Sequence, residues 1–357
     1  MMLLADILSS TLLFAIPLLL VALGGMCSER SGIINIALEG VIIIGALISC
    51  LILGQLNNAY QTACKMLEAG EGLSGWWALV YRLIHDAPQL AVFAAILAAA
   101  LAGVLYSLLL AFASINLMAD QTIGGTALNM LAPAFAVVLT WAIQGQGNTT
   151  ILIPNWTRIT VESSGAVYGA GFGQSVQAFF EKFLFKSMYL TTPIAIVLLI
   201  AVSVLIYKTR LGLRLRACGE HPQAADSVGI NVYKMRYAGV LISGFLGGVG
   251  GLAYTFAAGS GFNSTVGGYG FLALAVMIFG NWKPLPILAS SFFFALFKVI
   301  AAYSSSLPFL PTFSGVKDIS NFYQMLPYIV TMIVLIFTSK NSQAPKAEGI
   351  PYDKGSR

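Results

Sequence analysis

Residues 237–282 contain no Asp, Glu, Lys or Arg, although the segment just before them, 208–236, is strongly charged. A water-soluble domain does not need so long a stretch without charge, whereas a bilayer excludes charge over about 20 helical residues for each crossing. This contrast predicts a chain that is solvated by lipid. It also makes the charged segment 208–236 the place where we expect a soluble partner to bind.

The composition of the whole chain agrees with a lipid-solvated protein. Hydrophobic residues make up 58% of the 357 positions, charged residues only 9%, and the mean hydropathy is +0.83. Such a composition is typical of an integral membrane protein with several spans. The four cysteines, Cys27, Cys50, Cys64 and Cys218, are scattered without metal-ligand spacing, so we expect neither a zinc site nor a disulfide framework.

Apolar runs near the length of one crossing recur along the chain. We expect them at about 3–25, 33–54, 89–115, 123–143, 188–207, 237–258, 268–281, 285–303 and 324–338. The run at 268–281 is short and opens with Gly267, Gly268 and Gly270, so a half-helix or re-entrant segment is an alternative there. The sequence predicts an all-α polytopic membrane protein with about 8–10 transmembrane helices, discontinuous or re-entrant segments included.

The distribution of positive charge predicts the topology. Segment 208–236 should be cytoplasmic because it carries Lys208, Arg210, Arg214, Arg216, Lys234 and Arg236. The long segments 55–88 and 144–187 hold few positive residues and should be outer loops. We expect a transmembrane domain over 1–339 and a disordered cytoplasmic tail over 340–357. Nine full crossings would place the N-terminus outside, and one re-entrant segment in the first half would reverse that.

A first polar stretch, ERSGIINIALEG at 29–40, stands before and inside an apolar run. Ionisable groups at membrane depth are costly and face a protein interior or an aqueous path, which makes Glu39 a candidate functional residue. Gly32 and Gly40 would let the helix break, as discontinuous helices do around transport sites. Two interpretations stay open: Glu39 lines a pathway, or it forms a hydrogen bond to another helix.

A second polar stretch, ADQTIGGTALNMLAP at 119–133, places Thr122, Thr126 and Asn129 near helical spacing around Gly124 and Gly125. These residues can share one helix face. Small and hydroxyl side chains on one face are typical of a helix-packing seam in membranes. The alternative is that this face lines a polar cavity for an uncharged solute.

A third stretch, LGLRLRACGEHPQAADSVGIN at 211–231, lies in the charged loop. Pro222 suits the first turn of a helix and Gly229 suits its end, so one short surface helix is predicted. Such a helix could fit a groove on a partner, although a solvated linker would also explain the arginines. Lys298, alone in an apolar run, is expected to reach an interface or to pair with a carboxylate.

Motifs for ATP hydrolysis, metalloprotease chemistry or a nucleophile elbow do not occur in the sequence. If transport by this chain uses ATP, another polypeptide must bind the nucleotide. The net charge of +5 is explained by cytoplasmic segments beside anionic lipid, and no nucleic-acid partner is expected.

At these three stretches the sequence resembles permease subunits of bacterial ABC importers, in the group that includes branched-chain amino acid, ribose-type sugar and nucleoside permeases. ERSGIINIALEG is most similar to the nucleoside and simple-sugar members. The resemblance implies a heterodimer with a paralogous permease, ATP-binding subunits that hold ATP and Mg, and an extracytoplasmic solute-binding protein or lipoprotein. It also implies a multi-pass location in a bacterial cytoplasmic (inner) membrane. We expect no cofactor and no metal in this chain itself.

The resemblance also implies roles for individual residues. Asn35, Glu39, Thr126 and Asn129 would lie near the solute pathway. The coupling segment, where the ATP-binding subunit docks, would comprise Glu220, His221, Pro222, Ala224, Ala225, Asp226, Val228 and Gly229. The expected function is half of the pathway of an ATP-driven importer for a small polar solute, most of all a purine or other nucleoside. A simple sugar is an alternative solute, and a self-sufficient ion-coupled carrier or a non-transporting scaffold are alternative classes.

Overall fold

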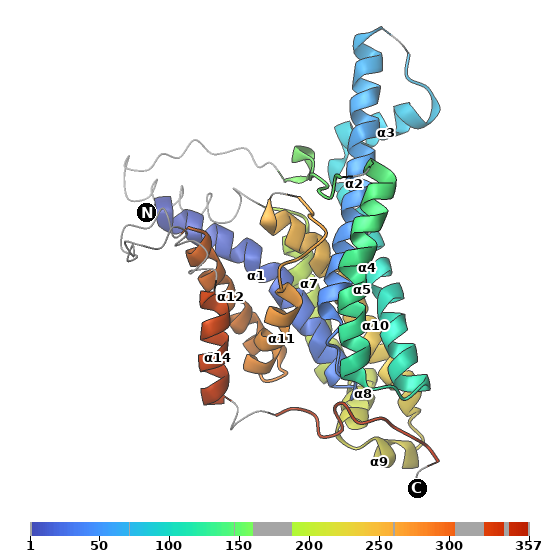
Figure 1. Ribbon diagram of the computed structural model, residues 1–357, viewed down its shortest axis with the longest axis vertical. Helices are drawn as coiled ribbons and strands as arrows, with labels where there is room; N and C mark the ends of the chain where they lie inside the picture. The colour runs from blue at the N-terminus through green and yellow to red at the C-terminus, as the bar shows by residue number, and fades with distance from the viewer. Residues whose placement is uncertain are drawn as a thin grey trace.

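The computed structural model describes residues 2–70, 72–145, 147–159, 188–259, 261–303, 325–338 and 343–355 (Figure 1). Within them, seven helices are long and apolar enough to cross a bilayer. These are α1 (Met2–Glu29), α2 (Leu38–Glu68), α4 (Pro88–Ala111), α5 (Gln121–Gln144), α7 (Thr191–Lys208), α10 (Val232–Ala258) and α12 (Pro284–Ala302). The described residues contain only two isolated β-bridges and no strand, so the all-α polytopic prediction is confirmed.

Shorter elements connect or accompany these helices. They are α3 (Gly75–Asp86), a π-helical end to α4 (Phe112–Asn116), a 3₁₀ turn (Asn155–Thr157), α8 (Arg210–Glu220), α9 (Pro222–Ser227), α11 (Tyr269–Phe279) and α14 (Leu326–Thr338). Local sequence explains several helix starts. Pro88, Pro222 and Pro284 occupy the first turn of their helices, where a missing N–H costs nothing. Asp120 caps α5 by accepting from the N–H groups of Thr122 and Ile123.

The centre of the bundle is a crossing of α2, α4 and α10 through glycines. A Cβ at Gly45 of α2 would collide with the backbone of Gly248, and a Cβ at Gly103 of α4 would collide with the carbonyl oxygen of Gly244. Backbones approach this closely in membranes because small residues remove the side chains between them. The seam fixes α10 as the helix around which α1, α2 and α4 pack.

The short run at 268–281 forms α11, which has 11 residues, so of the alternatives left open there the half-helix is the one observed. The chain before it re-enters the bundle. Phe262 is bridged to Ile151, which lies against Gly54 of α2, whereas Gly268 bonds to Glu39 near the start of α2. Gly54 and Glu39 are about 22 Å apart at 1.5 Å per helical residue. Residues 262–268 therefore run down α2 to the depth of its first turn, where α11 begins.

Two segments differ from what the sequence predicts. Residues 55–88 are not a loop, because α2 continues to Glu68 and α3 packs beside it. Residues 55–68 contain good helix formers and no Pro or Gly, so nothing ends α2 at the edge of its apolar run. The tail is not disordered over 343–355: it packs on α8, with Ala347 and Tyr352 only 6% and 7% exposed. Most of the second outer loop, at 144–187, lies outside the described residues.

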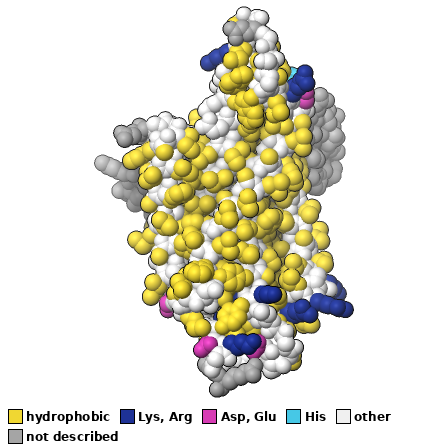
Figure 2. Space-filling view, turned by 90° about the vertical axis from the view of Figure 1, so that its right-hand side faces the viewer, with side chains coloured by type: hydrophobic (Ala, Val, Ile, Leu, Met, Phe, Trp, Pro, Cys, Tyr) yellow, Lys and Arg dark blue, Asp and Glu magenta, His cyan; other side chains and the backbone are white. Residues whose placement is uncertain are grey.

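The surface supports the expected topology. Figure 2 shows hydrophobic side chains over the middle of one face, with Lys and Arg gathered toward its two ends. The charged segment containing α8 and α9 lies at the same end as the C-terminal residues (Figure 1). The C-terminal end of α1 also reaches this end, since Arg30 contacts Gly219 of α8. The chain therefore enters α1 from the opposite side, as nine crossings would require.

Candidate functional site

The turn between α1 and α2, residues 30–37, is the first part of the candidate site. Gly32 has a φ of +96°, a left-handed conformation that glycine adopts without strain. Backbone groups in this turn lack helical partners, and side chains supply them. Ser28 Oγ donates to the carbonyl of Ile33 at 2.8 Å, and the N–H of Ile34 donates to Gln121 Oε1 at 2.8 Å. The non-helical turn is therefore tolerated because neighbouring helices satisfy it.

Asn129 on α5 holds the start of α2. Its Oδ1 accepts from the N–H of Gly40 at 2.8 Å, and its Nδ2 donates to the carbonyl of Ile36 at 2.8 Å. Asn35 is fully buried and donates to Ser243 Oγ of α10 at 2.8 Å. These two predicted pathway residues thus use their amides to join α2 to α5 and α10.

Thr126 lies on a different part of α5. It is exposed, and its hydroxyl donates to the carbonyl of Thr122 within the same helix at 2.7 Å. Its neighbours on this uncovered surface are apolar, Ile123 and Met130 among them. Of the four predicted pathway residues, Thr126 is exposed, whereas Asn35, Asn129 and Glu39 bond to other parts of the bundle.

Glu39 stands in the first turn of α2 and caps α11. Its carboxylate accepts from the N–H of Gly268 at 2.8 Å and from that of Gly270 at 2.6 Å, and the side chain is 8% exposed. The first N–H groups of a helix have no intrahelical partner and carry partial positive charge, so a carboxylate there is strongly favoured. The geometry shows the hydrogen bonds of the second interpretation, because Glu39 joins the starts of α2 and α11.

Tyrosines and one lysine surround the start of α11. The ring of Tyr269 contacts that of Tyr254 edge-on at 4.6 Å, and Lys298 Nζ lies 5.2 Å from the Tyr269 ring centroid. Tyr328 of α14 donates its hydroxyl to the carbonyl of Gly267 at 3.1 Å. The charge of Lys298 is close enough to act on the Glu39 carboxylate. Sequence reasoning missed the tyrosines, although Tyr269 stands directly among the glycines that mark the break.

The predicted coupling segment forms the short surface helix that Pro222 and Gly229 predict. Pro222 is in the first turn of α9, and Gly229 follows the helix with a φ of +84°. His221, Ala224, Val228 and Gly229 are exposed, Val228 by 74%. Glu220 and Pro222 are half-buried.

Two of the predicted coupling residues face the protein itself. Ala225 is 4% exposed and packs in a cluster with Cys218, Val232 and Tyr352. Asp226 lies 4.0 Å from Lys354 of the tail. Burial also raises the pKa of the Cys218 thiol to about 11, so it is an inert packing group. The face of α9 that a partner can reach is therefore narrower than the sequence indicates.

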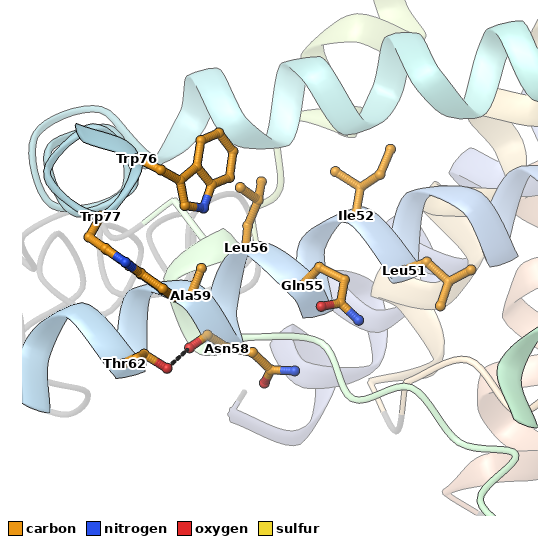
Figure 3. Close-up of a pocket in the computed structure, with 9 residues that line it drawn as sticks. All are labelled: Leu51, Ile52, Gln55, Leu56, Asn58, Ala59, Thr62, Trp76 and Trp77. Carbon is orange, nitrogen blue, oxygen red and sulfur yellow. Dashed lines mark hydrogen bonds between the residues drawn. The ribbon is translucent and has the colours of Figure 1, made fainter. Parts of the chain in front are cut away.

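A pocket of about 590 Å³ lies at the other end of the molecule, between the extended end of α2 and α3. Figure 3 shows the indoles of Trp76 and Trp77 beside α2, with the Thr62 hydroxyl bonded to the carbonyl of Asn58. The pocket is lined by Leu51, Ile52, Gln55, Leu56, Asn58, Ala59, Thr62, Trp76 and Trp77. It combines an apolar floor with amide edges beyond the apolar part of α2. No group of acids, histidines and cysteines in the described part of the chain could hold a metal ion.

The apolar helices, the crossing that is completed by the half-helix α11, and the small helix α9 exposed at the charged end are features of a membrane transport protein. Residues 7–338 match the family described as branched-chain amino acid transport system / permease component, and the chain belongs to that family. It is thus a transporter subunit, a multi-pass protein of the cell membrane.

The most informative relatives are two permeases of nucleoside systems. The chain is 39% identical to the guanosine ABC transporter permease protein NupQ of Bacillus subtilis, with 99% of this chain and 98% of that protein aligned. It is also 39% identical to the nucleoside ABC transporter permease protein NupC of Lactococcus lactis, over 98% and 96% of the two chains. The putative glucose ABC transporter permease protein TsgC13 of Haloferax volcanii is 26% identical over 93% and 91%. No solved structure matches the chain.

Proposed function

We propose that this chain forms half of the membrane pathway of an ATP-driven importer for nucleosides. The observation that carries the proposal is its identity of 39% to two nucleoside permeases along nearly the whole chain, compared with 26% to a glucose permease. The relatives' names describe ABC transporter permeases, which argues against the self-sufficient carrier and the scaffold.

The expected partners follow from that function. An ATP-binding subunit, holding ATP and Mg, would dock on the exposed face of α9, because α9 projects from the charged end of the bundle. A paralogous permease would complete the pathway. A second Lactococcus protein, the nucleoside ABC transporter permease protein NupB, is 30% identical over 107 residues and supports such a pair. An extracytoplasmic binding protein or lipoprotein would deliver solute near the Trp76 and Trp77 pocket.

The pathway itself would run along the exposed side of α5 that carries Thr126. Asn129 already uses both of its amide atoms on the turn, and Asn35 is fully buried and donates to Ser243 of α10, so both are poorly placed to bind solute. A nucleoside is uncharged and has several hydrogen-bonding edges, which suits hydroxyl groups on an otherwise apolar face. The face would be completed by the second permease.

The solute is tested by reconstituting the complete importer in liposomes and measuring ATP-dependent uptake of labelled guanosine, adenosine and glucose. Saturable uptake of a nucleoside, not competed by glucose, is expected. Uptake of glucose alone would refute the nucleoside assignment while leaving the permease assignment intact.

The pathway is tested by cysteine labelling in the same complex. A cysteine at position 126 should react with a small maleimide and be protected by saturating nucleoside, whereas one at position 35 should stay unreactive. Protection at position 35 but not at 126 would move the pathway into the bundle.

The docking face is tested by Val228→Asp, with Leu213→Asp as a matched control. Leu213 is 62% exposed on the neighbouring α8, outside the predicted docking face. A charge at position 228 should lower the amount of ATP-binding subunit that co-purifies, because the exposed apolar contact becomes a desolvated carboxylate. Equal losses for both variants would argue against α9 as the docking element.

A further inference from the structure

The C-terminal segment 343–355 crosses the end of the bundle where the charged loop lies. Figure 1 shows it passing below α8 and ending beside α9. Its backbone makes three bonds to different elements: the N–H of Gln343 donates to Asn281 Oδ1, that of Ala347 to the carbonyl of Gly219, and that of Gly349 to the carbonyl of Gly32. The segment thus joins the turn between α11 and α12, the end of α8 and the turn between α1 and α2.

The far end of this segment holds α9. Tyr352 shares a buried cluster with Ala225, the one buried residue of α9, and with Cys218 and Val232. Its ring meets that of Tyr233 edge-on at 5.6 Å. Since α9 is six residues long, it cannot be stable alone and depends on such contacts for its position.

The near end of the segment touches the turn that starts α2. Arg236 of α10 is 1% exposed and lies between the two regions. A Cβ on Gly32 would be 3.1 Å from its Nη2 and 3.3 Å from the carbonyl oxygen of Ala347, and its guanidinium carbon lies 6.0 Å from the Tyr352 ring centroid. A continuous line of packed groups therefore runs from α9 through Tyr352 and Arg236 to Gly32.

An acid pair reinforces the contact with α1. Glu348 of the segment lies beside Glu29, the last residue of α1, close enough for the two carboxyl groups to share a hydrogen bond. Glu29 in turn accepts from Trp282 Nε1 at 2.6 Å, so the tail and the turn before α12 meet on one carboxylate. Two carboxyl groups can share such a bond when one of them carries a proton.

We propose that residues 343–355 form a strap that positions α9 and carries its displacement to the turn between α1 and α2. The strap rests on the proposed function, in which α9 receives the ATP-binding subunit. The turn in question begins the helix that bears Glu39, whose carboxylate caps α11. Movement of α9 would thus reach the half-helix at membrane depth through packed side chains and would not depend on the direct contact of α8 alone.

The test uses Tyr352→Ala, with Ile350→Ala as the matched control in the same segment. Ile350 is 56% exposed and makes none of the contacts above. In liposomes containing the complete importer, nucleoside molecules taken up per ATP hydrolysed are measured. Tyr352→Ala should lower this ratio about two- to thirtyfold, the range over which altered coupling between sites acts, while Ile350→Ala leaves it unchanged. The ATP-binding subunit should still co-purify with Tyr352→Ala.

A truncation after residue 342 separates coupling from folding. It should show the same low ratio, and a synthetic peptide of residues 343–357 added to the inner side should restore it. An unchanged ratio in Tyr352→Ala, or no rescue by the peptide, would overturn the strap. If Val228→Asp abolishes docking while Tyr352→Ala has no effect, the strap alone fails. If neither variant changes binding or the ratio, the docking role of α9 fails with it.

Discussion

Replacing Asn129 by Ala should destabilise the bundle, whereas replacing Thr126 by Val on the same helix should not. Asn129 makes two bonds, each 2.8 Å, to the N–H of Gly40 and the carbonyl of Ile36, at the point where α2 begins. Thr126 bonds only to its own helix and is exposed. The two substitutions therefore compare an interhelical tie with a surface hydroxyl.

The magnitude follows from what Ala leaves behind. Interhelical hydrogen bonds in membranes average about 0.6 kcal/mol each. A backbone group left without a partner costs about 1–3 kcal/mol more. The two bonds contribute about 1 kcal/mol, and the two backbone groups, which are only part-buried, add about half of their full cost, or about 1–3 kcal/mol, so we expect a loss of about 2–4 kcal/mol in the free energy of unfolding for Asn129→Ala. Thr126→Val should change it by less than about 0.5 kcal/mol.

The assay is reversible unfolding of the purified permease in mixed micelles, with wild type, Asn129→Ala and Thr126→Val measured side by side. Uptake by the reconstituted importer is measured for the same variants. The reasoning is refuted if both variants have wild-type stability, or if Asn129→Ala abolishes uptake with its stability unchanged. The second outcome would make Asn129 a pathway residue.

Two further predictions concern packing and the tail. Gly103→Ala should prevent accumulation of folded protein, because its Cβ would collide with the backbone of Gly244 and Gly248. Gly124→Ala is the control and should express normally, since its Cβ would meet only Leu110 at 3.8 Å. Equal yields of the two variants in membranes would contradict the close packing of α2, α4 and α10 through glycines. Burial raises the pKa of Glu348 above its ordinary value of 4.5, so the protonated acid stabilises docking of the tail, and this contribution is fully present below about 4.5 and is lost as pH rises through the raised pKa. Hydrogen exchange of the tail amides should therefore become faster between pH 5 and pH 8 by more than the intrinsic pH dependence of exchange. Glu348→Gln should remove this additional increase in rate. An additional increase that persists in Glu348→Gln would mean that another group causes it.

The sequence predicts the helices and their approximate positions because lipid imposes a strong, length-dependent pattern on apolar residues. It also predicts the half-helix and α9 from glycines and a proline that begin or end helices, namely Gly268, Gly229 and Pro222. It does not predict where α2 ends, since residues 55–68 lose their apolar character without losing helix propensity. An apolar run shows where lipid begins and ends, not where a helix does.

The roles of the polar residues were harder to predict, because each depends on a partner distant in sequence. Asn129 bonds to groups 89 and 93 positions away, and Glu39 to groups 229 and 231 positions away. A polar side chain in an apolar run shows that a partner exists but does not show whether the partner is a backbone or a solute. The tail was missed for a similar reason: in its described residues only Pro345, Ala347 and Tyr352 are buried, too few to leave a pattern.

These polar contacts share one feature that bears on how the bundle could move. Asn129 and Glu39 each bind backbone groups at the start of a helix. Asn129 binds Ile36 and Gly40, at the start of α2, and Glu39, which lies between them, binds the start of α11. A displacement of the turn at 30–37 would therefore move the first turn of α2 and, through the Glu39 carboxylate, the start of α11 in one step. Helix termini held by single side chains can shift while the glycine contacts between α2, α4 and α10 stay intact. The close packing at these glycines resists deformation. The structure thus combines a rigid crossing of α2, α4 and α10 with a layer of breakable helix ends nearer to α8 and α9, and movement that begins at α9 meets that layer first.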